Sequence, residues 1–316
     1  MKRPYDAILM IAYGGPGSMD EVRPFLDNIL RGKRIPPQRI EKVVDQYRAI
    51  GGKSPLSDLI HDQADRLAAA LADAGLPLPV RVGMRNWPPL LNDVLAEMNR
   101  SGQRRILGLI CSIQQCDSSW GQYERDVAGA LQAVGAEDLR VDLLDNWHDH
   151  PLFIEAAADQ VSRALEQLPA DLRDEALLIF TAHSIPTQMP GADLYVRQIR
   201  TAAEAVAARL GRPRWEMAYQ SRSGRPDDPW LEPDIRQLII QRAADGVRAV
   251  VVVPIGFVCD HVEVLYDLDI DARAAAADAG LAFARAGTVG TCPAYIRMLV
   301  ELIDRRCRNP IETTST

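Results

Sequence analysis

The part of the sequence that most restricts the fold is a run of branched apolar residues near the end of the chain. Val247 and the four valines at 250–253 are followed by Pro254 and Gly256. A run this apolar is hydrophobic on both faces, which is typical of a buried strand in a parallel sheet. Pro254 and Gly256 predict that the strand ends there. A sheet with such a strand needs helices on both sides, which indicates an α/β fold.

Three carboxylates follow this strand at a helical spacing. Asp260 is positioned to cap a helix that begins near His261. Glu263, Asp267 and Asp271 occupy positions i, i+4 and i+8, so they share one face and repel by about 0.2–0.5 kcal/mol per neighbouring pair. One interpretation is a solvated acidic face. The other is a face that meets a cation, because ligands of open α/β sheets bind beyond the carboxyl ends of the strands.

A histidine at the end of a second apolar run favours the cation-binding interpretation. Residues 176–186 read ALLIFTAHSIP, which predicts a buried strand that delivers His183 to its carboxyl end before Pro186 stops it. A lone histidine in a strand is more often a structural core residue. A position just past the strand end, however, belongs to the ligand-binding edge of the sheet. His183 and Glu263 together therefore predict a site.

Strand and helix patterns alternate along the whole chain, as in parallel α/β proteins. The polar segment 145–151 is suited to a domain junction. The pattern before it repeats after it, which predicts two similar Rossmann-like domains, residues 1–146 and 147–316, each with a mainly parallel sheet flanked by helices. The active-site cleft is expected between them. We expect strands at 7–12, 79–84, 105–111, 139–144, 177–181, 215–219, 247–253 and 282–285, and helices at 19–30, 40–49, 56–74, 91–99, 151–168, 193–210, 233–245 and 293–308, with others starting near 119 and 261.

Two local details belong to this pattern. Ser18 and Glu21 have the spacing of a capping box at the start of the first helix. The final helix, 293–308, is amphipathic, and one option is that it packs back on the first domain.

Composition excludes several classes of partner. The net charge is −7 and no basic stripe is visible, which argues against nucleic acid. The five cysteines are odd in number and form no CxxC pair, which favours a reducing compartment. No run of eighteen apolar residues occurs and no apolar leader precedes the first strand, so we expect a soluble, cytoplasmic protein without a transmembrane segment.

Five motifs in order make the sequence similar to a known family. They are AYGGP at 12–16, YRAIGGKSPL at 47–56, TAHSIP at 181–186, DPWL at 228–231 and GFVCDHVEVLYD at 256–267. Together they resemble the ferrochelatase family over residues 5–304. The resemblance implies the chelatase fold and a lyase-type enzyme of heme biosynthesis that inserts Fe²⁺, its substrate metal, into a porphyrin.

The chemistry of metal insertion matches the predicted pair. A porphyrin binds a divalent ion only after two pyrrole protons leave, and histidine is the natural base near neutral pH. His183 is expected to be that base or the weak ligand that presents Fe²⁺, with Glu263 as its partner. The resemblance does not assign the two roles. A closed cysteine site would bind the ion with a free energy of about 10 kcal/mol or more and would not release it to the porphyrin. Asp267 and Asp271 would continue the acidic face as a path for the cation, and His261 is expected to point away as a structural residue.

Tyr13 bears on which porphyrin is used. In the resembling family, a tyrosine after the first strand is typical of the branch that handles coproporphyrin III, where it lies over the ring and can bind the iron of the product. Matching positions for contacts with the porphyrin and its propionates are Arg31, Tyr47, Ser54 and Tyr123. The chain departs from relatives at Leu30, Gln46 and Gln114. Arg31 and the neighbouring Lys33 and Arg34 are expected to replace the two cations that positions 30 and 46 lack.

Several alternatives stay open. The function expected is a ferrochelatase acting on coproporphyrin III; the alternatives are protoporphyrin IX as substrate, a non-catalytic tetrapyrrole carrier, and, ranked third, a sirohydrochlorin chelatase.

Cys292 and Cys307 lack the tight clustering of a [2Fe-2S] site, so no cluster is expected. Cys111 and Cys116 are interpreted as small buried or loop residues. A downstream heme-pathway enzyme is the expected partner for the product.

Overall fold

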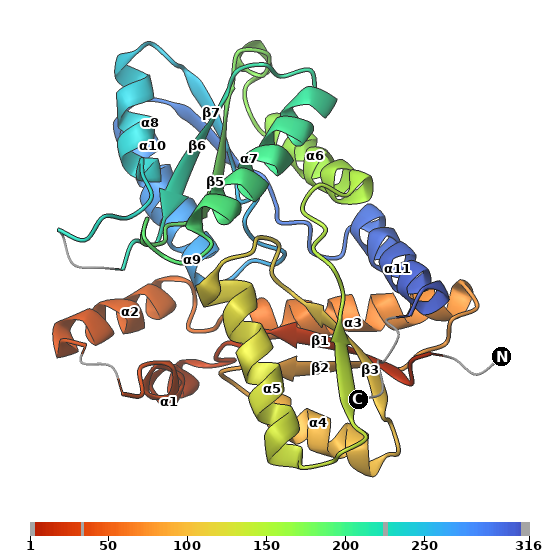
Figure 1. Ribbon diagram of the computed structural model, residues 1–316. Coiled ribbons are helices and arrows are strands. Elements are labelled where there is room, and N and C mark those ends of the chain that lie inside the picture. Colours follow the sequence, from red (N-terminus) through yellow and green to blue (C-terminus); the bar gives the residue numbers. More distant parts are fainter. Residues whose placement is uncertain (1–3, 33–34, 224–226, 311–316) are drawn as a thin grey trace.

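The computed structural model describes residues 4–32, 35–223 and 227–310 and contains two parallel sheets, one in each half of the chain (Figure 1). The first sheet has the order β2-β1-β3-β4, and the second has the order β6-β5-β7-β8. The strands are β1 (Ala7–Ala12), β2 (Val80–Met84), β3 (Arg105–Ile110), β4 (Arg140–Leu143), β5 (Leu177–His183), β6 (Trp215–Gln220), β7 (Ala249–Val253) and β8 (Ala282–Arg285). The predicted fold class is confirmed.

Helices cover both faces of the first sheet because its central strand is apolar on both sides. Ile8, Met10 and Ala12 of β1 pack in the cluster that contains α3, whereas Leu9 and Ile11 pack against α4 and α5. The helices of this half are α1 (Met19–Ile29), α2 (Pro37–Ala49), α3 (Leu56–Asp73), α4 (Leu91–Arg100), the π-helix η1 (Asp117–Gly121) and α5 (Gln122–Val134).

The second sheet repeats this arrangement. Val251 and Val253 of β7 face the cluster that contains α6 and α7, and Val250 and Val252 face the one that contains α8 and α10. The helices are α6 (Pro151–Leu165), the short η2 (Ala170–Leu172), α7 (Ala192–Arg209), α8 (Ile235–Ala244), α9 (Val262–Leu265), the π-helix η3 (Asp267–Ala272), α10 (Arg273–Asp278) and α11 (Pro293–Arg308).

The two halves share one continuous core. α11 packs against both α6 and α3, and it runs along the side of both halves in Figure 1. Arg306 of α11 donates to Asp145 at 2.6 Å, and Gln63 Nε2 of α3 donates to the carbonyl of Gly290 at 2.8 Å. The final helix thus contacts the first half as well as its own. The domain boundary at residue 146 lies between β4 and β5 and stays a prediction.

Three local expectations are wrong. The acidic helix is not continuous, because α9 ends at Leu265 and the chain continues as the π-helix η3. His261, not Asp260, caps α9, because the Asp260 carboxylate is bound to Arg285 instead. Ser18 makes no capping bond, and Glu21 accepts instead from the backbone N–H of Gly17 at 2.7 Å.

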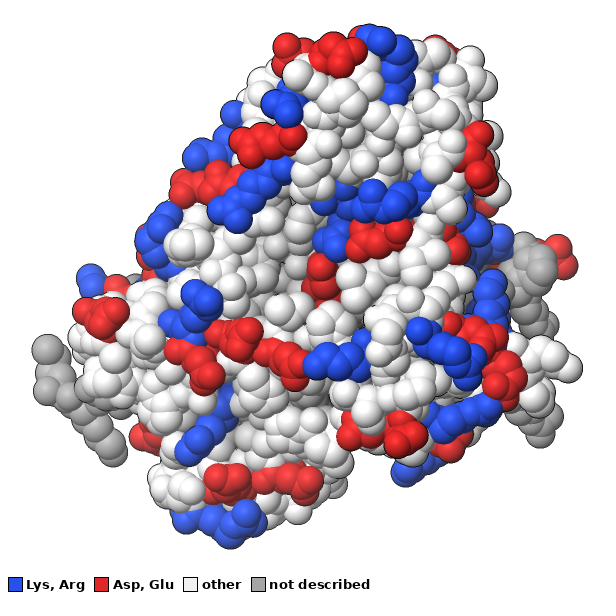
Figure 2. Space-filling model, turned by 180° about the vertical axis from the view of Figure 1, so that it is seen from behind, with Lys and Arg blue, Asp and Glu red and all other residues white. Residues whose placement is uncertain are grey.

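The surface shows no large region of one charge on the face drawn in Figure 2, where acidic and basic side chains are interspersed. Within residues 4–32, 35–223 and 227–310, no helix is both long and apolar enough to cross a bilayer.

Candidate active site

The site forms where the carboxyl end of β5 meets the segment that follows β7. His183 is the last residue of β5. Gly256, in the loop after β7, donates its N–H to the carbonyl of Thr181 at 3.1 Å. A Cβ on Gly256 would lie 2.7 Å from the Cβ of Ala182, so only glycine allows this close approach. The contact brings the segment that carries Glu263 alongside His183.

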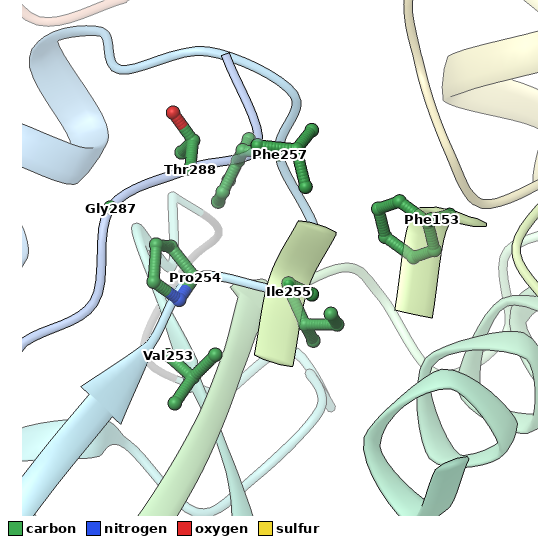
Figure 3. A pocket seen from close by; sticks show the side chains of 9 residues that line it. Phe153, Val253, Pro254, Ile255, Phe257, Gly287 and Thr288 are labelled. Carbon is green, nitrogen blue, oxygen red and sulfur yellow. The ribbon is translucent and has the colours of Figure 1, made fainter. Parts of the chain in front are cut away.

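The same loop also lines a small apolar cavity (Figure 3). Its volume is about 10 Å³, at the lower limit for a single water, which is far too small for a substrate. Its lining includes Phe153, Val253, Ile255 and Phe257. The Phe257 ring also packs edge to face on His261, with centroids 4.5 Å apart. The cavity therefore belongs to the packing that supports the site.

His183 and Glu263 face each other as an ion pair. His183 Nε2 lies 3.5 Å from Glu263 Oε1, and Nδ1 is hydrogen-bonded to the carbonyl of Ser184. Burial opposes a charge on His183, but the Glu263 carboxylate and the two hydrogen bonds outweigh it and raise the pKa to about 9. Burial likewise opposes a charge on Glu263, and His183 outweighs it and lowers the pKa to about 2. Each residue keeps the other charged at neutral pH.

His261 lies beside this pair instead of pointing away from it. Its Nδ1 accepts from the backbone N–H of Glu263 at 3.2 Å, which is the capping bond of α9. Burial lowers the pKa of His261, with the charge on His183 adding to this effect. His261 thus has the structural role that was predicted, in a different place.

Asp267 and Asp271 follow Glu263 on the π-helix η3, not on one continuous helix, and both have partners within the protein. The Ser221 hydroxyl donates to Asp267, and Ser221 itself has a left-handed backbone with φ 61°. Burial, with smaller contributions from Glu263 and Asp271, raises the pKa of Asp267 to about 7. Asp271 lies 3.8 Å from Arg236 Nη1. The cation that relieves the repulsion at Asp271 is therefore an arginine of the protein.

Two tyrosines of the first half, Tyr13 and Tyr47, lie within electrostatic range of Glu263. Tyr13 follows β1, remains 42% exposed and lies within electrostatic range of Glu263. Desolvation and the charge on Glu263 raise the pKa of its phenol to about 12, against the opposing effect of Arg85. Tyr47 and Tyr123 are almost fully buried, and burial raises the pKa of each. Val262 of α9 packs against the cluster around Tyr47, so both halves contribute to the site.

Arg85 is a site residue that sequence reasoning missed. Its guanidinium lies 5.6 Å from the ring centre of Tyr13 and 4.9 Å from that of Tyr123, and it forms an ion pair with Asp126. An arginine just past the end of β2 has no distinctive pattern. It could have been found from its position, because Arg85 and Tyr13 each follow a strand and so lie at the same carboxyl end of the parallel sheet.

The other residues predicted to contact the porphyrin differ in their exposure to solvent. Arg31 is exposed at the end of α1, and its guanidinium donates to Asn28 at 3.3 Å. Ser54 is buried, and its hydroxyl accepts from the N–H of Leu56 at 3.3 Å, so it holds the turn before α3. Gln114 is buried and donates to the carbonyl of Ile255 at 3.3 Å, which ties the two halves together. Leu30 and Gln46 are half-buried, and Lys33 and Arg34 lie outside the described residues.

Comparison with known proteins agrees with this geometry. The family model described as Ferrochelatase matches residues 5–307. The chain belongs to the ferrochelatase family. The chain is 44% identical over 303 residues to a protein of Mycolicibacterium smegmatis named coproporphyrin III ferrochelatase, covering 95% of this chain and 89% of that protein. A protein of the same name from Streptomyces coelicolor is 44% identical over 321 residues, covering 96% of this chain and 86% of its own length.

Two solved structures share the fold of this chain. SirB from Bacillus subtilis with Fe³⁺ has a TM-score of 0.58 at 9% identity and covers 95% of this chain and 94% of its own. CbiX, described as the terminal enzyme for biosynthesis of siroheme in denitrifying bacteria, has a TM-score of 0.53 at 17% identity, with 95% and 98% covered. At these identities the likeness concerns the fold alone.

Proposed function

We propose that this protein is a ferrochelatase that inserts Fe²⁺ into coproporphyrin III, giving coproheme and two protons for heme biosynthesis. The observation that carries the proposal is the His183–Glu263 pair, 3.5 Å apart at the ligand-binding edge of the sheet and within electrostatic range of Tyr13 of the other half. The family and the names of the relatives at 44% identity support the same reaction.

His183 is proposed as the proton acceptor and Glu263 as the carboxylate that meets the metal. The bond from Nδ1 to Ser184 fixes the histidine ring and leaves Nε2 directed at Glu263. When Fe²⁺ takes the carboxylate, the attraction that holds a proton on Nε2 is lost, and the neutral nitrogen can accept a pyrrole proton. His183 first gives its own proton to solvent, then accepts the two pyrrole protons one after the other and passes each to solvent. One Fe²⁺ thus replaces two protons in the ring, and the charge balances. A single carboxylate that leaves the other positions of the ion open holds Fe²⁺ weakly enough to release it.

The first half is proposed to hold the porphyrin. Tyr13, which is exposed, supplies aromatic surface for the macrocycle, and Arg31 supplies charge for propionates. The buried Tyr47 and Tyr123 support Tyr13 through Phe25 and Arg85. Ser54 acts by fixing the turn next to Tyr13, since its hydroxyl already accepts from Leu56. Asp267 and Asp271 are proposed as the route by which the cation reaches Glu263.

We propose no [2Fe-2S] cluster for this chain. Cys292 precedes α11 and Cys307 lies near its end, which puts the two sulfurs about 20 Å apart at 1.5 Å per helical residue. Cys292 Sγ also accepts from Gln160 at 2.8 Å. A downstream heme-pathway enzyme as acceptor of the product stays a prediction.

The alternative is a carrier that binds the porphyrin without inserting metal. The test is anaerobic incubation of the protein with Fe²⁺ and coproporphyrin III, followed by the loss of porphyrin fluorescence and the appearance of the coproheme spectrum. The wild type should turn over. His183→Ala should bind the porphyrin and lose insertion by about 10²-fold or more, the usual cost of a lost acid–base group. His61→Ala, at an exposed position on α3, is the matched control and should keep the rate. Binding without turnover in the wild type would establish the carrier.

A further inference from the structure

The segment that carries Glu263 is made of elements that are not stable alone. α9 has four residues and η3 is a six-residue π-helix. Isolated helices this short do not form in water, and π-helices are rare and short. The position of the Glu263 carboxylate must therefore be set by contacts that tie this segment to the sheet.

Arg285, the last residue of β8, makes those contacts on one edge of the sheet. Its guanidinium donates to both oxygens of Asp260, each at 3.1 Å, and to both oxygens of Asp269, at 3.0 and 2.7 Å. Thr288 adds a bond to Asp260 at 3.1 Å. Only 12% of the Arg285 side chain is exposed, so solvent screens these bonds little. Asp260 lies just before α9 and Asp269 lies inside η3, so one arginine holds both ends of the segment.

The opposite edge of the sheet holds the middle of the same segment. Gln220, at the end of β6, donates to the carbonyl of Glu263 at 3.3 Å, and Ser221 bonds to Asp267. Strands β6 and β8 are the two edges of the sheet. The segment therefore lies across the carboxyl ends of the strands, anchored on both sides, with Glu263 between the anchors.

We propose that Arg285 is a positioning residue for metal insertion: by binding Asp260 and Asp269 together, it fixes the distance and direction of Glu263 relative to His183. Arg285 touches neither residue of the pair, so its effect passes through the backbone between 260 and 269. Without it, two partly buried carboxylates lose their common partner and repel each other, and the segment between them shifts. The inference rests on the proposed function, since it concerns the geometry of that reaction.

The same domain offers a matched control. Arg242 also forms a two-pronged pair with one carboxylate, Glu216 at 2.6 and 2.8 Å, and a bond with a second, Asp245 at 2.7 Å. Arg242 lies near the end of α8, and Glu216 lies at the start of β6, which is the opposite end of the parallel strands from His183. Loss of Arg242 therefore removes a similar set of bonds without touching the segment that carries Glu263.

The experiment compares Arg285→Gln, Arg285→Lys and Arg242→Gln in anaerobic Fe²⁺ insertion into coproporphyrin III, with thermal denaturation of each. We expect Arg285→Gln to lower kcat by about tenfold to a hundredfold, which is the loss of rate that a misplacement of about 1 Å can cause. The KM for the porphyrin should stay within about twofold of wild type. Arg285→Lys keeps the charge but not the paired geometry, so it should recover part of the rate. Arg242→Gln should lower the Tm and keep kcat.

Each outcome decides the matter. A kcat for Arg285→Gln that matches Arg242→Gln, or a loss confined to the Tm, overturns the positioning role. If Arg285→Gln does not fold, Asp269→Asn takes its place: it keeps Arg285 and weakens one anchor, so a fall in kcat supports the role and an unchanged kcat overturns it. A wild type that inserts no metal refutes the proposed function and this inference with it, whereas an active wild type with an active Arg285→Gln refutes the inference alone.

Discussion

At the scale of single residues, the charges on His183 and Glu263 depend on each other. The pKa of His183 is raised from 6.5 to about 9, so its contribution to stability is full below pH 6.5 and is lost as the pH rises through 9. The pKa of Glu263 is lowered from 4.5 to about 2, so its contribution is full above pH 4.5 and is lost as the pH falls through 2. The pair therefore stabilises the free protein fully between pH 4.5 and pH 6.5, where Glu263 is ionised and His183 carries a proton.

This state predicts a shift in the pH dependence of the reaction. His183 must be neutral to accept a pyrrole proton, so kcat/KM should rise with pH along an acid limb. In Glu263→Gln the attraction that raises the pKa of His183 is gone and burial lowers it, so the limb should move to lower pH although the rate falls. The measurement is kcat/KM from pH 5.5 to 9.5 for both proteins. A limb that stays in place would show that another group titrates.

Tyr13 should act only after iron has entered the ring. Its phenol has a pKa of about 12 and stays neutral at neutral pH, so only a bound metal would convert it to a phenolate. We expect a ferric phenolate band in the visible spectrum of the oxidised product complex, and its absence in Tyr13→Phe. Tyr266→Phe, which changes a tyrosine beside Asp267 and Asp271, is the control and should keep the band. The same band in Tyr13→Phe would assign the ligand elsewhere.

At the scale of elements, the π-helix η3 sets how the acidic side chains meet the cation. Asp271 is already opposed by Arg236, while Asp267 accepts only the hydroxyl of Ser221 among the bonds found in the described residues. Asp267→Ala should therefore raise the KM for Fe²⁺ by about tenfold, which is the lower end of what one charge-assisted contact contributes to binding. Asp271→Ala should raise this KM less. Neither change should alter the KM for the porphyrin. Steady-state kinetics with varied Fe²⁺ check this, and an unchanged metal KM in both variants would return η3 to a solvated acidic face.

The elements divide into those that the sequence predicts and those that it does not. β7 and α11 are predicted within two residues because their apolar patterns are local and strong. The break between α9 and η3 is not predicted, because it depends on Arg285, Ser221 and Arg236 arriving from distant strands and helices. For the same reason Asp260 was misread as a cap. Arg85 was missed because its role comes from Tyr13 and Tyr123, which lie far from it in the sequence.

At the scale of the whole molecule, the two halves divide the proposed work. The second half supplies His183 and Glu263, and the first half supplies the tyrosine and arginine side chains that are proposed to hold the porphyrin. The halves are joined through buried amides, Gln63 to Gly290 and Gln114 to Ile255, and through α11. These ties indicate that the two halves form a single framework.

The substrate follows from the cations that this framework presents. Coproporphyrin III has four propionates and protoporphyrin IX has two, so each cation at the rim favours the former. Leu30 and Gln46 remove two cations, whereas Arg31 is exposed at the end of α1. Arg85 is already paired with Asp126, so the preference is argued from Arg31. One additional charge-assisted contact is sufficient for a tenfold preference, about 1.4 kcal/mol.

The measurement that tests the central claim most directly is the ratio of kcat/KM for Fe²⁺ insertion into coproporphyrin III and protoporphyrin IX, with the wild-type protein under one set of anaerobic conditions. The account predicts a ratio of at least about ten in favour of coproporphyrin III. A ratio near one, or a preference for protoporphyrin IX, would contradict the assignment to coproporphyrin III while leaving the chelatase reaction in place.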